Sequence, residues 1–149
     1  MNTTLGAVRK EVVVPVDPAR AFEAFTAEVA RWWPLASHSV GGADAVGVSI
    51  DPRVGGLVAE ATNAGERHLW GVVRLWDPPR RAVMSWHPGR EAADPTEVEI
   101  RFEQVAEGTR VILEHRGLTA TWWPGERASY DAGWTPVLER FADALRAAA

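Results

Sequence analysis

The clearest alternation of hydrophobic and polar residues in the chain runs from Thr96 to Val105. The apolar positions of one parity are Val98, Ile100 and Phe102, and the charged positions of the other are Glu97, Glu99, Arg101 and Glu103. Such a period of two predicts a half-buried antiparallel strand. Beyond a turn at Glu107-Gly108, the segment from Thr109 to His115 alternates again, with Val111, Leu113 and His115 on one face. The two segments therefore predict a β-hairpin with one buried face.

Shorter apolar runs bounded by turn residues predict further strands at residues 8–16, 46–50, 57–61, 68–76 and 82–86. The run at 68–76 is apolar at both parities, so both of its faces are expected to be covered near its centre. After the first strand, Asp17-Pro18 predicts a helix start, because Asp accepts backbone N–H bonds and Pro suits the first helical position. One apolar helical face then continues through Phe22, Phe25, Val29 and Trp32 until Pro34 stops it.

The C-terminal segment predicts a long helix. Its apolar positions share one face: Tyr130, Trp134, Val137, Leu138, Phe141 and Leu145. Pro136 conflicts with this pattern, because a proline inside a helix loses a backbone hydrogen bond and costs about 3 kcal/mol. Either the helix kinks near Ala132, or Thr135 caps a new helix that starts at Pro136. The continuous apolar face favours the kink.

The order of these elements is strand, helix, several strands and a long helix. Connections of hairpin length exclude a parallel, doubly wound sheet, so the expected class is α+β with an antiparallel sheet of about six to seven strands. The 149 residues contain no linker and no low-complexity segment. This predicts a single domain over residues 1–149.

Composition narrows the function classes. The net charge of −4 argues against nucleic-acid or anionic-membrane binding, which needs a basic surface. The chain has no cysteine, which excludes disulfides, thiol nucleophiles and cysteine-ligated metals. No signal-peptide core and no membrane-spanning run is present, so a cytoplasmic location is expected. The four histidines form no recognised metal spacing, and the glycine pairs lack phosphate-loop patterns. No metal and no cofactor is expected.

A set of short motifs spans nearly the whole chain. They are residues 19–26, Arg31-Trp32-Trp33-Pro34, Gly55-Gly56, residues 70–73 before Asp77-Pro78-Pro79, Trp86, residues 108–111, residues 114–118 and Gly133-Trp134. In this order they resemble the activator-of-Hsp90-ATPase-like branch of the START/Bet v 1-like superfamily, which includes polyketide cyclase-related proteins. The resemblance implies a helix-grip fold, in which a curved sheet wraps around the long C-terminal helix and encloses a cavity. Pro136 and Trp122-Trp123-Pro124 depart from the expected pattern.

The superfamily contains binders, cyclases, dehydratases and co-chaperone domains, so the resemblance indicates the fold more strongly than the function. Among ionisable residues, His115 shares the inward parity of Val111 and Leu113 and is a candidate general acid or base. The alternative is a structural histidine at a strand end. Arg74 is a candidate carboxylate-binding group if it faces the cavity. Its alternatives are a salt bridge to Glu60 or an outward-facing charge. His87 has the opposite parity from Met84 and Trp86 and is expected to face outward.

Tryptophan provides the stronger signal, since eight tryptophans outnumber four phenylalanines and one tyrosine. The tripeptide Trp-Trp-Pro occurs at residues 32–34 and again at 122–124. These residues either frame the entrance of a pocket for an apolar or aromatic ligand or plug it. The expected ligand-binding residues are Trp32, Trp33, Trp70, Trp86, Phe102, Trp122, Trp134, Val137 and Phe141.

Three functions follow, in decreasing order of preference. The first is binding of a small hydrophobic or aromatic molecule between the sheet and the C-terminal helix. The second is a cyclase, dehydratase or hydrolase that uses the same cavity. The third, implied by the family resemblance alone, is an Hsp90-linked interaction domain with a chaperone partner. The apolar residues at both parities of residues 68–76 also leave a homodimer open.

Overall fold

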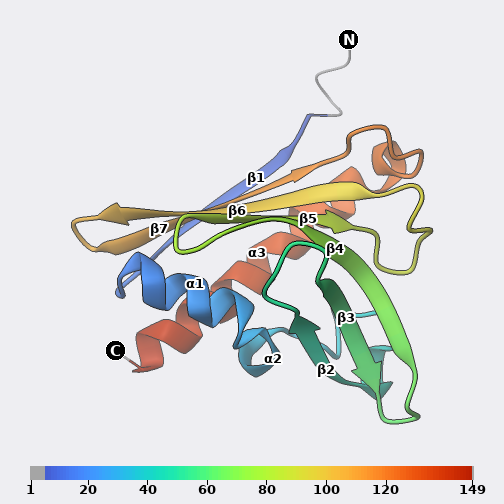
Figure 1. Ribbon diagram of the computed structural model, residues 1–149, viewed down its shortest axis with the longest axis horizontal. Helices are drawn as coiled ribbons and strands as arrows, with labels where there is room; N and C mark the ends of the chain where they lie inside the picture. Colours follow the sequence, from blue (N-terminus) through green and yellow to red (C-terminus); the bar gives the residue numbers. More distant parts are fainter. Residues whose placement is uncertain (1–5, 149) are drawn as a thin grey trace.

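The computed structural model describes residues 6–148, and its strands form one seven-stranded antiparallel sheet in the order β1-β7-β6-β5-β4-β3-β2. The strands are β1 (Val8–Val14), β2 (Ala45–Ile50), β3 (Leu57–Thr62), β4 (Arg67–Asp77), β5 (Arg81–Trp86), β6 (Thr96–Val105) and β7 (Gly108–Arg116). The sheet curves over the C-terminal helix α3 (Trp123–Ala148), which lies on its concave side with α1 (Pro18–Thr26) (Figure 1). The predicted α+β helix-grip fold is confirmed.

The segment predicted as one helix from Pro18 to Trp32 is two helices. Asp17 caps α1 as expected, because its carboxylate accepts the N–H of Arg20 at 2.8 Å. The chain then leaves helical geometry at Glu28 before α2 (Val29–Trp32) begins. The guanidinium of Arg20 donates two hydrogen bonds of 2.7 and 3.0 Å to the Glu28 carboxylate, and these bonds stabilise the turn. The apolar spacing alone does not show this break, because both helices present their apolar residues to the same core.

Helix α3 runs through Pro136 without interruption, so the alternative of a new helix starting at this residue is wrong. Pro136 lies on the exposed side of the helix. The packed face of α3 carries Trp134, Val137 and Phe141, each at most 3% exposed. A kink near Ala132 stays a prediction.

The parity predicted for the β6–β7 hairpin is confirmed. Val98, Ile100 and Phe102 face the core at 0–4% exposure, as do Val111 and Leu113. The opposite face carries alternating charges that form ion pairs across strands. Glu99, for example, accepts hydrogen bonds from Arg81 at 3.1 Å and from Arg116 at 2.9 Å. The Glu99 carboxylate itself is buried at 6% exposure, and these hydrogen bonds satisfy its charge.

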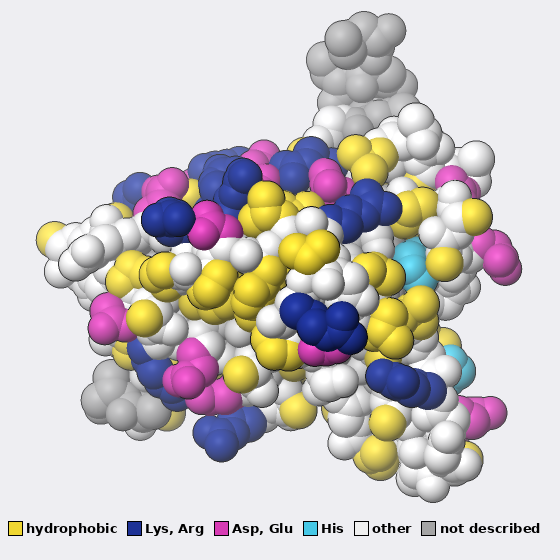
Figure 2. Space-filling model, in the orientation of Figure 1, with side chains coloured by type: hydrophobic (Ala, Val, Ile, Leu, Met, Phe, Trp, Pro, Cys, Tyr) yellow, Lys and Arg dark blue, Asp and Glu magenta, His cyan; other side chains and the backbone are white. Residues whose placement is uncertain are grey.

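The outer face of β3 and β4 exposes two leucines among charged residues such as Arg67 and Arg74. Leu57 is 39% exposed and Leu69 is 36% exposed. Figure 2 shows hydrophobic side chains in a broken band across the visible face, with charged side chains gathered along its upper edge. Among the described helices, none combines the length and the apolar character needed to cross a membrane.

Candidate functional site

A pocket of about 440 Å³ opens between the sheet, the loop after α2 and the first half of α3. Its apolar wall consists of Trp33, Trp70, Trp86, Trp134 and Val137. Its polar side consists of Ser37, His38, Ser39, Glu126, Ser129 and Tyr130. Val40, Pro88, Gly89 and Gly133 complete the lining. A largely apolar concave site with a few polar groups is the usual form of a small-molecule site.

Four tryptophans of this lining contact one another, and we call them the tryptophan wall: Trp33, Trp70, Trp86 and Trp134. The ring centroids of Trp70 and Trp86 lie 5.6 Å apart, and those of Trp86 and Trp134 lie 5.4 Å apart. The ring centroid of Trp33 lies 5.2 Å from that of Trp70 and 5.8 Å from that of Trp134. Tilted and edge-to-face pairs at these distances are favourable arrangements for aromatic rings. The wall therefore joins α2, the sheet and α3 in a single packed unit.

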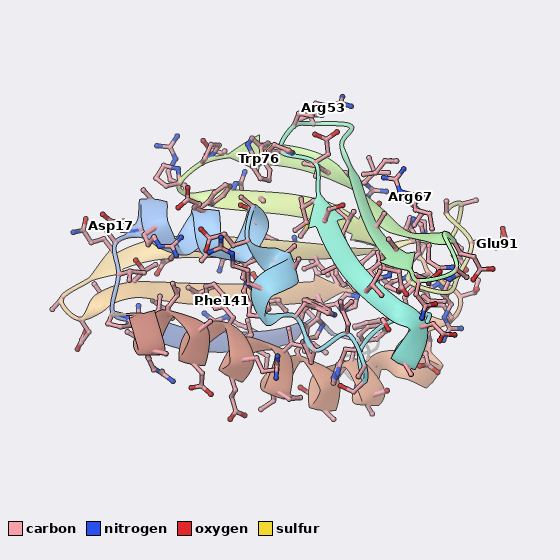
Figure 3. All side chains as sticks on the ribbon, turned by 90° about the horizontal axis from the view of Figure 1, so that it is seen from below. Asp17, Arg53, Arg67, Trp76, Glu91 and Phe141 are labelled. Atoms are coloured by element: carbon pink, nitrogen blue, oxygen red, sulfur yellow. The ribbon has the colours of Figure 1, made fainter. Side chains whose placement is uncertain are left out.

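Beyond the tryptophan wall, the rest of the space between α3 and the sheet is filled. A neighbouring void lined by Phe25, Met84 and Ile100, among others, measures only about 10 Å³. Three residues expected at the ligand site lie in this filled part instead: Trp32, Phe102 and Phe141. Phe141 projects from α3 toward α1 (Figure 3) and its ring centroid lies 5.1 Å from those of Phe25 and Trp32. These residues face inward like the pocket residues, but they lie nearer to α1; Phe141, for example, follows Trp134 by seven residues on α3.

Trp122, the remaining residue expected at the ligand site, does not line the pocket. Its indole N–H donates to the backbone oxygen of Asp94 at 2.8 Å, and Arg90 lies over its ring at 4.8 Å. The Asp94 carboxylate accepts from the Thr121 hydroxyl at 2.5 Å. Trp122 thus joins the loop after β5 to the loop before α3. Its neighbour Trp123 packs inward against Gly117, where any side chain would clash with the indole.

The loop that brings Ser37, His38 and Ser39 to the pocket is held by a buried carboxylate. Glu60 on β3 is 0% exposed and accepts hydrogen bonds from the backbone N–H groups of Val40 and Gly41, both at 2.7 Å. It also accepts from the indole N–H of Trp70 at 2.7 Å. Three donors on one carboxylate satisfy a buried charge that would otherwise be costly. Glu60 therefore connects the loop, the sheet and the tryptophan wall.

His115, the first catalytic candidate, is fully buried and both of its ring nitrogens have partners. The indole N–H of Trp134 donates to Nδ1 at 3.0 Å, so Nε2 carries the proton and donates to the Thr96 hydroxyl at 2.7 Å. Thr96 donates in turn to the backbone oxygen of Trp86 at 2.6 Å. Burial lowers the pKa of His115 to about 3. This chain of donors orients two members of the tryptophan wall and leaves no nitrogen free for a ligand.

Arg74, the second catalytic candidate, is exposed and does not line the pocket. Arg74 therefore does not face the cavity, and it does not form a salt bridge to Glu60. The Glu60 carboxylate instead accepts hydrogen bonds from N–H donors. His87 also differs from expectation. It is 2% exposed, although an outward position was expected, and its Nδ1 has no hydrogen-bond partner. Within residues 6–148, no group of three or more His, Asp or Glu side chains is placed to hold a metal ion.

Two polar groups of the pocket were not found by sequence reasoning. His38 lies in a segment interpreted only as a polar, glycine-rich loop, and its Nδ1 lies 2.7 Å from the Ser37 hydroxyl. Tyr130 projects from α3, with its ring 4.6 Å from that of His115. Burial raises the pKa of Tyr130 to about 12, so its hydroxyl keeps its proton and acts as a donor. Among the described residues, neither His38 Nε2 nor the Tyr130 hydroxyl has a hydrogen-bond partner.

A family model with the description "Activator of Hsp90 ATPase homolog 1-like protein" matches residues 15–146. No curated protein matches this sequence. Among solved structures, the chain is similar to protein NE0264 from Nitrosomonas europaea, with 13% identity, a TM-score of 0.72 and coverage of 100% of this chain and 99% of the other. It is also similar to the Aha1 dimer from Colwellia psychrerythraea, with 18% identity, a TM-score of 0.69 and coverage of 93% and 95%.

A third similar structure is the anthrahydroquino-γ-pyrone synthase Txn09, which was solved as a complex. It shares 29% identity with this chain over 96% of this chain and 99% of its own, with a TM-score of 0.60. The first two likenesses concern the fold alone. The likeness to Txn09 is closer in sequence and extends over the segments that form the pocket.

Proposed function

The chain belongs to the Activator of Hsp90 ATPase homolog 1-like family, and we propose that it binds a small aromatic molecule in the pocket beside the tryptophan wall. The family and fold are compatible with ligand-binding and cyclase-type roles in general. The observation that carries the narrower proposal is the pocket itself. Its lining combines four contacting tryptophans with several polar groups.

The chemistry of the two sides indicates a flat ligand with polar substituents. Indole rings offer wide apolar surfaces that pair well with another ring. The pocket volume of about 440 Å³ falls within the range of about 300–1,000 Å³ that is usual for small-molecule sites. The hydrogen bonds of Trp33, Trp70 and Trp134 to His38, Glu60 and His115 fix the orientation of the rings. A rigid site loses little conformational entropy on binding, which favours affinity.

The test places a larger side chain in the pocket by a substitution on helix α3. Gly133 lines the pocket, and a Cβ added there would lie 3.6 Å from His38 Nε2, so the further atoms of a longer side chain compete with a ligand for the space beside His38. We expect Gly133→Leu to reduce binding of the dye 8-anilinonaphthalene-1-sulfonate (ANS) by at least about tenfold, because its side chain occupies the ligand volume. Binding is measured by the rise in ANS fluorescence on titration.

Gly125→Leu is the matched control. Gly125 lies in the same helix, is exposed, and has no neighbour within 4 Å of an added Cβ. This variant should bind ANS as the wild type does. Equal binding by the wild type and by Gly133→Leu would place the dye elsewhere and contradict the proposal.

A second candidate function is a cyclase-type enzyme that acts in the same pocket. Its support is the 29% identity with a synthase, together with two unpaired polar groups beside an aromatic wall. The positions of His115 and Arg74 do not support a catalytic role for either residue. His115 is fully buried, and Arg74 is exposed outside the pocket. Turnover of a polyketone substrate that is abolished by Gly133→Leu but kept by Gly125→Leu would establish this function over binding alone.

The Hsp90-linked role rests on the family description. It requires an exposed interaction surface, and the outer face of β3 and β4, with its exposed Leu57 and Leu69, is a candidate. The same face is the one available to a homodimer, and one structural relative is described as a dimer. We expect a pull-down with an Hsp90-type chaperone to recover none of this protein. Recovery that Leu57→Glu abolishes would instead support the chaperone role.

A further inference from the structure

Resting on the proposed function, we infer that His38 is the residue that selects the ligand, and that the pocket takes an aromatic molecule with a ring hydroxyl donated to His38 Nε2. Of the four histidines, only His38 lines the pocket. His115 is sealed between Trp134 and Thr96, and His87 is buried outside the lining.

The backbone around His38 is fixed at several points. The indole N–H of Trp33 donates to the His38 backbone oxygen at 2.7 Å, and the His38 N–H donates to the Pro34 oxygen at 2.9 Å. Two residues further on, Glu60 holds the N–H groups of Val40 and Gly41. The imidazole is therefore positioned before a ligand arrives, as a selective group has to be.

The ring is oriented by its other nitrogen. Nδ1 lies 2.7 Å from the Ser37 hydroxyl, so Nε2 is the nitrogen left for a ligand. Nε2 lies beside α3 at the pocket lining, because a Cβ at Gly133 would lie 3.6 Å from this atom. The absence of a side chain at Gly133 leaves the space in front of the nitrogen open.

The hydrogen-bond chain behind His38 favours a donor as the ligand group. When Nε2 accepts from a ligand hydroxyl, Nδ1 carries the proton and donates to Ser37 Oγ. The Ser37 hydroxyl can then donate to the Pro34 oxygen, 3.4 Å away. Every donor in this sequence has an acceptor.

Tyr130 provides the complementary group. Tyr130 lines the same pocket, and its protonated hydroxyl can donate to an oxygen on the ligand, including an ether oxygen. It therefore adds affinity without separating hydroxyl-bearing ligands from their methyl ethers. Discrimination between these two classes falls to His38, because in the tautomer with Nδ1 protonated its Nε2 accepts from a hydroxyl and has no hydrogen to donate to an ether.

The experiment compares 2-naphthol with 2-methoxynaphthalene, which keeps the ring and the oxygen but has no hydrogen to donate. Each is titrated against bound ANS, and displacement gives the two affinities. In the wild type, 2-naphthol should bind about three- to tenfold more tightly, which is the effect of one net hydrogen bond. His38→Leu should bring the two affinities together, and His38→Gln, whose amide oxygen accepts, should keep part of the preference.

Two controls isolate the effect. Tyr130→Phe should weaken both ligands alike and keep the preference, and His68→Gln, outside the pocket lining, should change neither affinity. Retained ANS binding shows that His38→Leu still folds with an intact pocket. Equal affinities in the wild type, or a preference that persists in His38→Leu, would overturn the assignment of His38 and leave the aromatic pocket standing. Failure of both naphthalenes and of ANS to bind would instead remove the proposed function.

Discussion

The space between the sheet and α3 has two ends. Both are lined by aromatic residues, but one end is filled and the other borders a pocket. At the end near α1, Phe22, Phe25, Phe102 and Phe141 pack edge to face with centroids 5.1–6.2 Å apart and leave no room. At the other end, the tryptophan wall borders a pocket of about 440 Å³. The difference lies in what stands opposite the rings. Helix α1 covers the phenylalanine end, whereas a loop held by Glu60 and a glycine on α3 border the tryptophan end.

The filled end should carry more of the stability than the open end. Phe141 is 0% exposed and contacts Phe25 and Trp32. Phe141→Ala should lower the free energy of unfolding by about 3–5 kcal/mol, because it removes a buried ring and leaves a cavity. Chemical denaturation measures the loss, and ANS titration should show the pocket at the other end still binding. A loss below about 1 kcal/mol would mean that this end is not the packed core described above.

The open end depends on a neutral histidine, which makes its contribution sensitive to pH. An unfolded histidine has a pKa of about 6.5, and burial lowers that of folded His115 to about 3. Above about pH 6.5 both states are neutral, and stability does not depend on this residue. Between these two pKa values, His115 binds a proton in the unfolded chain but stays neutral in the folded chain. The free energy of unfolding should therefore fall by about 1.4 kcal/mol for each pH unit as the pH decreases.

The variant His115→Gln isolates this contribution from the carboxylates that titrate in the same range. Its amide can still accept from Trp134 and donate to Thr96, but it does not titrate. Denaturation curves from pH 7 to pH 4 should show a smaller slope for this variant than for the wild type and for the control His68→Gln. Identical slopes in all three proteins would show that His115 takes up a proton in the folded state.

The loop that keeps the pocket open should loosen when Glu60 is changed. In Glu60→Gln one acceptor oxygen becomes an NH₂ group facing an N–H donor, so we expect a loss of about 1–3 kcal/mol. Hydrogen exchange at the Val40 and Gly41 amides should accelerate by at least about tenfold. Glu66→Gln, an exposed residue on the neighbouring turn, is the control and should change neither quantity. Unchanged exchange at both amides would refute the proposed role of Glu60.

The contrast between the two ends also explains which expectations succeeded. Alternation along β6 and β7 correctly predicted the inward face, and with it the burial of Phe102 and His115. The alternation pattern shows which face of the sheet a residue occupies, but not where the residue lies along the strand. Thr96 at the pocket end and Phe102 at the filled end are six residues apart on β6, about 20 Å of extended strand. For this reason residues of the same inward face separate: Trp70, Trp86, Trp134 and Val137 line the pocket, while Phe102 and Phe141 do not.

His38 and Trp122 show a second limit of sequence reasoning. The position of His38 depends on Glu60, more than twenty residues away along the chain, so no local pattern reveals it. The repeated Trp-Trp-Pro tripeptide invited the same role for Trp33 and Trp122, yet only Trp33 reaches the pocket. In the second copy α3 begins at Trp123, whose ring packs on His115 at 4.6 Å, while Trp122 turns away to Asp94. The same tripeptide thus takes different orientations after α2 and before α3.

The smallest expected effect tests whether the open end is maintained at a cost. Gly133 lies inside α3, where glycine is less favourable than alanine by about 0.5–1 kcal/mol. An alanine Cβ would meet only His38, at ordinary contact distances of 3.6 and 3.8 Å. Gly133→Ala should therefore raise the free energy of unfolding by roughly that amount while weakening 2-naphthol more than ANS, because the methyl group stands in front of His38 Nε2. If stability rises and affinity for 2-naphthol is unchanged, the glycine does not serve the pocket, and the openness of this end comes from the Glu60-held loop alone.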